Sequence, residues 1–252
     1  MVDSKQIWIG GRQFLIHVLG GGDAYSSSLG SRFGDDLLQT VSSRLSEDSI
    51  ALDIGANIGL TACALSQVAR HVYAFEPNPP VFDLLRTNVE ANGLQNVVIR
   101  QMAVGANAGE AYFAGDSAFG HVTQKETSVV VPMGTVDGIV DALGLDRVDF
   151  IKVDVEGFEP QVLKGALQTI ERFNPIIYLE FNSWCLMAFG ETNPMLFARW
   201  ICHHFQQRQM VGKGNDASET IATAEAIVYS NVVLNNSVND LILRRRPASP
   251  VA

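Results

Sequence analysis

From residue 49 onward, short apolar runs alternate with segments that have helical spacing. The apolar runs, each long enough for one buried strand, lie at 49–54, 71–75, 96–104, 148–153 and 175–181. The segments with helical spacing lie at 58–69, 79–92, 135–143, 160–173 and 193–207. This alternation predicts an α/β fold, a doubly wound and mostly parallel sheet with helices on both faces.

The two ends of the chain and its middle depart from this alternation. Residues 6–19 have the pattern of a β-hairpin with Gly10-Gly11 at the turn, 20–34 predict a loop, and 35–46 have helical spacing. We therefore expect a hairpin-and-helix cap over residues 1–48 and the main domain over 49–252. Short strands are expected around a Gly/Ser loop within 105–133, and strands near 208–212 and 225–234 predict an antiparallel edge.

The first strand of the main domain ends in the sequence DIGANIG, from Asp53 to Gly59. Glycines allow a backbone to approach a ligand closely, and the following helix offers free N–H groups and a partial positive charge. Asp53 is placed to pair with an ammonium group. The spacing G-x-x-x-G differs from the G-x-G-x-x-G of dinucleotide-binding folds, which disfavours an NAD-dependent oxidoreductase. A tight turn without a ligand is the simpler alternative.

The ends of the second and third strands predict the rest of a nucleoside site. The second strand ends in Glu76-Pro77, where an acidic side chain can accept hydrogen bonds from both ribose hydroxyls. Near the end of the third strand, Gln101, Met102 and Ala103 are expected beside an adenine ring. Core packing explains Met102 equally well.

Acidic residues follow the next two strands. Asp154 and Glu156 come after the strand at 148–153, and Glu180 lies near the end of the fifth strand, so the three are expected at one rim. One of them can act as general base, two or three can bind Mg²⁺, or Asp154 can simply help to hold the nucleoside. His121, in an irregular segment, is a further candidate base, although a lone surface histidine is the simpler interpretation. No particular metal ligand is predicted.

Three segments together are similar to one known family. DIGANIG, FEPNP and FIKVDVEGFEPQVLKGA resemble the FkbM family of S-adenosylmethionine (SAM)-dependent methyltransferases, over residues 50–182. The resemblance implies a Rossmann-like class I methyltransferase fold and methyl transfer to a hydroxyl oxygen of a sugar, glycan or secondary metabolite. It places SAM on the residues Asp53, Gly55, Asn57, Gly59 and Glu76.

Charge and one further motif bear on the alternatives. The net charge of −9 argues against a phosphate-binding face, and therefore against a nucleic-acid partner. Asn78-Pro79-Pro80 is similar to the motif of DNA adenine methyltransferases, but it follows the second strand and Val81 replaces the aromatic residue. A small-molecule or glycan acceptor is expected. The alternatives are a nucleic-acid or protein methyltransferase and a non-catalytic nucleoside-binding protein of the same fold.

Cysteine use and hydropathy give expectations about the compartment. The three cysteines form no C-x-x-C pair, which favours a reducing environment. No signal peptide and no stretch of 18 apolar residues is apparent, so we expect a cytoplasmic protein without a membrane span. The sequence predicts no oligomeric state.

Overall fold

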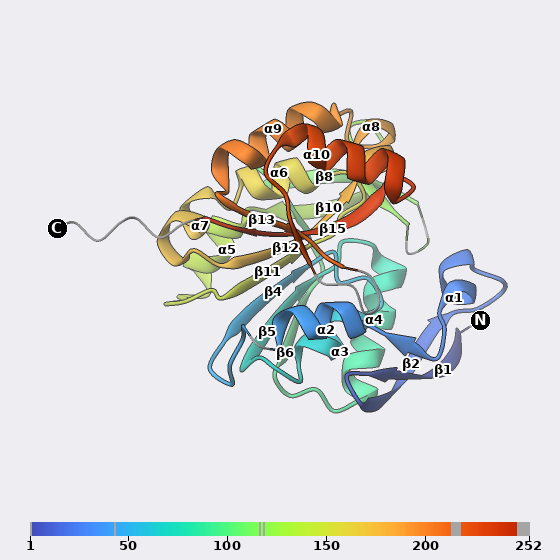
Figure 1. Cartoon of the computed structure of the whole chain (residues 1–252). Coiled ribbons are helices and arrows are strands. Elements are labelled where there is room, and N and C mark those ends of the chain that lie inside the picture. Colours follow the sequence, from blue (N-terminus) through green and yellow to red (C-terminus); the bar gives the residue numbers. More distant parts are fainter. Residues whose placement is uncertain (1, 43, 116, 118, 213–217, 246–252) are drawn as a thin grey trace.

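The computed structural model describes residues 2–42, 44–115, 117, 119–212 and 218–245. Its centre is an eight-stranded sheet in the order β14-β13-β15-β12-β11-β4-β5-β6 (Figure 1). The parallel strands are β4 (Ile50–Ile54), β5 (His71–Phe75), β6 (Val97–Arg100), β11 (Phe150–Val153) and β12 (Ile176–Asn182). The antiparallel edge consists of β13 (Gln207–Met210), β14 (Glu219–Thr220) and β15 (Val238–Arg244). The predicted Rossmann-like, mostly parallel sheet is confirmed.

Helices cover both faces of this sheet, as Figure 1 shows. On one face lie α2 (Asp35–Val41), α3 (Leu60–Leu65) and α4 (Pro79–Ala91). On the other lie α5 (Val136–Ala142), α6 (Glu159–Lys164), α7 (Leu167–Phe173), α8 (Ser183–Ala188), α9 (Pro194–His204) and α10 (Ala224–Tyr229). Because successive strand residues point to opposite faces, Phe150 belongs to the first core while Ile151 and Val153 belong to the second. Lys152 therefore points to the first face.

A second, smaller sheet fills the irregular middle of the chain. It has the order β7-β10-β8-β9, with strands β7 (Ala103–Val104), β8 (Gly109–Ala114), β9 (His121–Thr123) and β10 (Val129–Gly134). The run at 96–104 was expected as one strand, but it divides between the two sheets. His121 opens β9 and pairs with Ala114, which fixes the position of this predicted site residue.

The prediction of a strand at 225–234 was wrong. This segment forms α10 and a π-helix, η1 (Ser230–Leu234), and the edge strand β15 follows it. Its β-branched residues imitate a strand, and a short apolar run does not distinguish a strand from a buried helix. Asn231 is fully buried in the helical form and its amide donates to the Phe181 carbonyl at 2.6 Å, which anchors η1 against β12.

Two other predicted elements have different limits in the structure. The helix expected at 160–173 is two helices, because Gly165 packs against the backbone so closely that a Cβ there would lie 2.1 Å from the Gly105 carbonyl oxygen. The loop expected at 20–34 contains a short helix, α1 (Ala24–Ser28), and a short strand, β3 (Arg32–Phe33). Neither has an apolar pattern long enough to be recognised in the sequence.

The expected N-terminal hairpin is present as β1 (Val2–Ile9) and β2 (Arg12–Leu19), and it lies beside α4 in Figure 1. Two amides on α4 complete the outer edge of β2. Asn92 exchanges hydrogen bonds with the Leu15 backbone at 2.8 and 3.0 Å, and Asn88 does so with the His17 backbone at 2.6 and 3.0 Å. The i, i+4 spacing on the helix matches the two-residue period of the strand edge. These contacts attach the hairpin to the main sheet.

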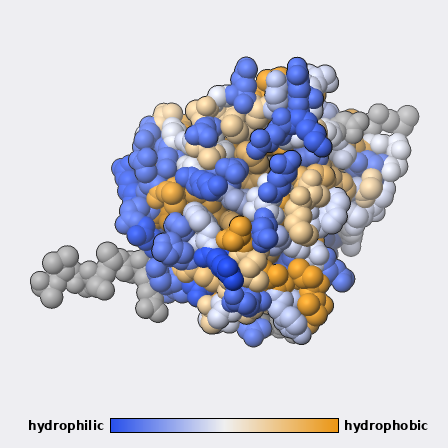
Figure 2. Space-filling view, turned by 90° about the horizontal axis from the view of Figure 1, so that it is seen from above, coloured by the Kyte–Doolittle hydropathy of each residue, from blue (hydrophilic) through white to orange (hydrophobic). Residues whose placement is uncertain are grey.

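The surface is mixed in character. Figure 2 shows hydrophilic side chains spread over the face seen from above, with hydrophobic residues gathered in small patches. Within the part of the chain that the structure describes, no helix is both long and apolar enough to span a membrane.

Replacing Asn88 by Ala should lower the free energy of unfolding by about 2–4 kcal/mol, because the buried backbone groups of His17 and the Ile58 carbonyl would lose their partners. Urea denaturation measures this change. Glu90→Ala, at an exposed position of the same helix, is the control and should change the value by less than about 0.5 kcal/mol. Equal effects of the two substitutions would contradict the proposed attachment.

Candidate functional site

A cavity of about 240 Å³ opens at the carboxyl ends of β4, β5 and β11. This is where ligands bind in open α/β sheets. Its walls come from the turns after these strands, from the 113–122 region of the small sheet and from the N-terminal cap. Among the lining residues are Tyr25, Phe33, Gly55, Ala56, Asn57, Thr61, Phe75, Glu76, Pro77, Met102, Ala103, Phe113, Phe119, His121, Lys152, Asp154, Glu156, Phe158 and Glu180.

Glu76 connects the turn after β4 to the segment that follows β5. Its Oε2 accepts a hydrogen bond from the Asn57 backbone N–H and its Oε1 accepts one from the Asn78 backbone N–H, both at 2.9 Å. Burial raises the pKa of Glu76 to about 7, although these two hydrogen bonds favour the ionised form. Each carboxylate oxygen still has a free lone pair, so Glu76 can accept further hydrogen bonds from a ligand in the cavity.

The two glycines of the first turn are required by the chain itself. Gly55 has φ +80° and a Cβ there would lie 1.8 Å from the Asp154 carbonyl oxygen. Gly59 has φ +97° and a Cβ there would lie 2.8 Å from Leu85 of α4. Backbone conformation and packing thus explain both positions, and of the two only Gly55 lines the cavity.

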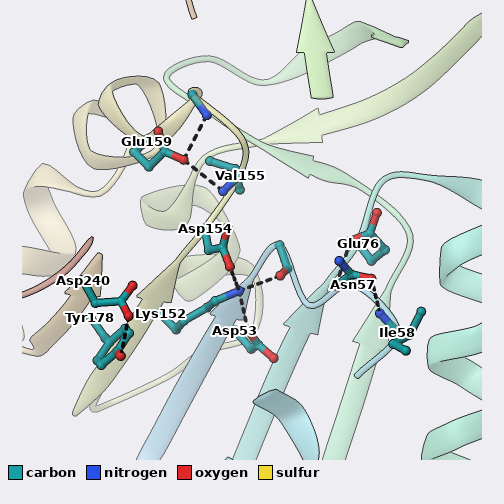
Figure 3. A network of polar contacts seen from close by, with 12 residues as sticks. Asp53, Asn57, Ile58, Glu76, Lys152, Asp154, Val155, Glu159, Tyr178 and Asp240 are labelled. Carbon is teal, nitrogen blue, oxygen red and sulfur yellow. Dashed lines mark hydrogen bonds and ion pairs between the residues drawn. The ribbon is translucent and has the colours of Figure 1, made fainter. Parts of the chain in front are cut away.

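Lys152 is the centre of a buried ionic network on the first face of the sheet, shown in Figure 3. Its Nζ donates to the Gly55 carbonyl at 2.7 Å and lies 3.2 Å from Asp154 and 3.7 Å from Asp53. Burial alone would lower the pKa of Lys152, but the two carboxylates raise it, so the lysine stays charged. Asp53 is fully buried, and burial raises its pKa to about 6.

Three carboxyl groups, from the turn after β11 and from β12, line the same cavity, as the sequence predicted. Asp154, Glu156 and Glu180 all line it. Burial raises the pKa of Glu180 well above its ordinary value, and the nearby Asp154 raises it further. The pKa of Glu156 is raised for the same two reasons. More negative charge faces this cavity than Lys152 can compensate, so the site favours a positively charged or proton-donating ligand.

Glu159 holds the turn that carries Asp154 and Glu156. Its Oε1 accepts hydrogen bonds from the backbone N–H groups of Val155 at 3.0 Å and Gly157 at 3.1 Å (Figure 3). Glu156 has φ +53°, a rare conformation for a residue with a side chain, and its Oε2 accepts a hydrogen bond from the Cys185 thiol at 3.0 Å. The strained backbone directs the Glu156 side chain into the cavity.

Aromatic rings close the side of the cavity away from the sheet. The His121 ring stacks on Phe189 at 3.8 Å, and burial lowers the His121 pKa, so the imidazole is uncharged near neutral pH. Tyr25 from α1 meets Phe119 edge-on at 5.8 Å. Because Tyr25 belongs to the cap and Phe119 lies between β8 and β9 of the small sheet, two distant segments share this wall.

The structure brings together most of the residues predicted for the site. Of the predicted set, the residues that line the cavity are Gly55, Asn57, Glu76, Pro77, Met102, Ala103, His121, Asp154, Glu156 and Glu180. Asp53 lies behind them and contacts Lys152, whereas Gly59 and the exposed Gln101 are not part of the lining. Among the described residues, no group of three His, Cys, Asp or Glu side chains is arranged to hold a metal ion, so the expectation of Mg²⁺ finds no support.

The sequence did not identify several residues of the cavity. Tyr25 and Phe33 lie in the cap, in a segment without periodicity, and nothing in the sequence indicated that it folds over the site. The sequence did indicate a role for Lys152, because it is a charged residue in the apolar strand FIKV and lies beside the predicted acids.

Residues 53–201, more than half of the chain, match the family described as Methyltransferase FkbM domain. Hexuronic acid methyltransferase AglP of Haloferax volcanii is 32% identical over 146 residues, which cover 56% of this chain and 60% of that protein. Methyltransferase sdnD of Sordaria araneosa is 30% identical over 161 residues, which cover 48% of this chain and 62% of that protein. The similarity thus spans less than two thirds of the length of either relative.

Of two similar solved structures, one shares the fold at a TM-score of 0.50. An rRNA methylase from Streptococcus thermophilus superposes with a TM-score of 0.50 at 10% identity, covering 84% of this chain and 95% of that chain. The methyltransferase FkbM from Methylobacillus flagellatus has a TM-score of 0.47 at 17% identity, covering 79% of this chain and 44% of that chain. The sequence match over 53–201, with DIGANIG, FEPNP and FIKVDVEG around one cavity, shows that this chain belongs to the FkbM methyltransferase family.

Proposed function

We propose that this protein is a SAM-dependent O-methyltransferase that acts on a hydroxyl group of a sugar or a related hydroxylated metabolite. The observation that carries the proposal is the arrangement of one cavity with two parts. Glu76 follows β5 on one side of it, and Asp154, Glu156 and Glu180 come from the turn after β11 and from β12 on the other side. Such a cavity offers hydrogen-bond acceptors for ribose and negative charge for a cationic centre.

The residues present fit SAM as a cofactor. Met102 and Ala103 offer an apolar surface for adenine, and Glu76 offers acceptor oxygens for the ribose hydroxyls. Burial and the nearby Asp154 raise the pKa values of Glu156 and Glu180, and a positively charged ligand would stabilise their ionised forms. When bound, SAM supplies an electrophilic methyl group on a positively charged sulfur.

The residues of the chain have three tasks in this proposal. The aromatic wall of Tyr25, Phe119 and His121 excludes water from the reactants. The turn held by Glu159 positions the acidic side chains relative to the cofactor part of the cavity. Asp154, paired with the charged Lys152, and His121, uncharged near neutral pH, are the groups able to accept the proton of the acceptor hydroxyl.

A hydroxyl acceptor is supported by the charge of the chain and by one relative. The net charge of −9 disfavours a polyanionic acceptor such as nucleic acid. The Haloferax volcanii relative is named for a hexuronic acid, which supports a sugar as the acceptor class. We place the reaction in the cytoplasm, because the three cysteines of the sequence suit a reducing compartment.

Incubation with methyl-labelled SAM and a panel of sugars, polyhydroxylated metabolites, RNA and protein tests this proposal. Label should appear on the oxygen of a sugar or metabolite, because the carboxyl groups of the cavity accept hydrogen bonds from hydroxyl groups and repel a polyanion. Mass spectrometry of the product identifies the methylated atom. Transfer to RNA or protein alone would contradict the acceptor class, and failure of SAM to bind in calorimetry would contradict the cofactor.

Replacing Glu76 by Gln should weaken SAM binding by about 1–3 kcal/mol, since an amide accepts fewer hydrogen bonds than a carboxylate and leaves backbone N–H groups unpaired. Isothermal titration calorimetry measures the change. Glu90→Gln, on the exposed side of α4, is the matched control and should leave the affinity unchanged. An unaltered affinity of the Glu76 variant would show that the ribose lies elsewhere.

The affinity for SAM should rise with pH between 6 and 8. Burial raises the pKa of Glu76 to about 7, so below pH 7 the free protein carries a proton there. A ribose that donates to this carboxyl group stabilises its ionised form, so binding releases the proton. A change of up to about tenfold is expected over this range. The Glu76→Gln variant should lose this part of the pH dependence; identical profiles in calorimetry would contradict the assignment.

A further inference from the structure

A polar groove adjoins the cavity on the first face of the sheet, between the start of α2, the end of β12 and the start of β15. It shares five residues with the cavity: Phe33, Thr61, Lys152, Asp154 and Glu180. Its outer wall comes from residues 32–39 on one side and from Val238 and Asp240 on the other. Both of these outer segments lie outside the residues that match the FkbM family.

We propose that this groove receives the sugar acceptor and that it selects uncharged or amine-bearing sugars over carboxylated ones. The proposal rests on the methyltransferase function proposed above and adds the place and the charge of the acceptor. The five shared residues, Asp154 among them, line both the groove and the cavity. A hydroxyl presented from the groove therefore reaches Asp154, one of the two groups able to take its proton.

The charges along the groove determine this preference against carboxylated sugars. Two cationic side chains line it, and each is compensated: Arg32 pairs with Asp35 at 2.9 Å, and Lys152 lies between Asp154 at 3.2 Å and Asp53 at 3.7 Å. The carboxyl groups that line it are Asp35, Asp36, Asp154, Glu180 and Asp240. The acids thus outnumber the bases among the described lining residues, so a carboxylate entering the groove is repelled.

Glu180 gives the groove a specific acceptor of hydrogen bonds. It lines both the cavity and the groove, and it lies opposite Asp240 in the β12–β15 pairing. Its Oε2 is buried and accepts no hydrogen bond within the described structure, whereas Asp240 is already bound by the Tyr178 hydroxyl at 2.8 Å. A buried oxygen of this kind is stabilised by a hydroxyl or ammonium donor and destabilised by another carboxylate.

The test compares three methyl glycosides that differ in one group: a glucoside, a glucosaminide and a glucuronide. With labelled SAM, transfer to the glucoside or glucosaminide should be at least about tenfold faster than to the glucuronide. Equal or faster transfer to the glucuronide would overturn the proposal, as would transfer to none of the three while SAM still binds in calorimetry. Loss of SAM binding itself would overturn the proposed function as well, so the two failures are distinguishable.

Substitutions in the groove test its location. Val238→Trp fills the groove from a 40% exposed position and should lower sugar methylation at least about tenfold, with SAM affinity within about twofold of the wild type. Val233→Trp, at a 58% exposed position outside the groove, is the control. Equal activity of the two variants would overturn the assignment of the groove.

A charge substitution tests the selection itself. Asp35→Asn frees Arg32 and should raise the glucuronide rate relative to the glucoside rate by about fivefold. Asp83→Asn removes an equivalent i, i+3 pair with Arg86 on α4, away from the groove, and should leave the ratio unchanged. An unchanged ratio in the Asp35 variant would show that charge does not select the acceptor.

Discussion

The buried ammonium group of Lys152 is the interaction on which the site depends. It joins the two central strands, because its Nζ donates to the Gly55 carbonyl of the turn after β4 while its own strand, β11, leads directly into Asp154. A buried charge is tolerated only when it is paired, and here Asp53 and Asp154 supply the pairing. The same contacts fix the distance between the turn after β4 and the turn after β11. The geometry of the cavity therefore depends on the pairing of the Lys152 charge.

That compensation leaves the site with an excess of acid. Asp53, Glu76, Glu156 and Glu180 all have raised pKa values, and burial is the largest cause in each case. Four carboxyl groups around one lysine are unfavourable for the ligand-free protein, whose stability they reduce when they ionise. The proposed cofactor carries a positive charge and several hydroxyl donors, so its binding would stabilise the ionised carboxyl groups. An electrostatically unfavourable site is typical of a protein whose stability is completed by its ligand.

The sequence predicted the parts of the structure that depend on local pattern. Strand runs, the helices between them and the acids after each strand were enough to bring Glu76, Asp154 and Glu180 to one edge of the sheet, because parallel strands share their carboxyl ends. What it did not predict depends on contacts between distant segments. Residues 225–234 have the composition of a strand and become helical where Asn231 binds β12, and Tyr25 reaches the cavity only because α4 holds the hairpin in place.

This division also separates two kinds of function within the chain. The residues that match the family, 53–201, contain the cofactor turn, the lysine and the acids, whose mutual distances are fixed by neighbouring strands. The segments at 32–39 and 238–240 lie outside that match and meet the same acids from the other side. Because Asp35, Asp36 and Asp240 line the groove and do not line the cavity, the charge of the groove can change while the lining of the cavity stays the same. In the proposed function, the strand ends therefore hold the cofactor, and the segments at 32–39 and 238–240 contact the molecule that receives the methyl group.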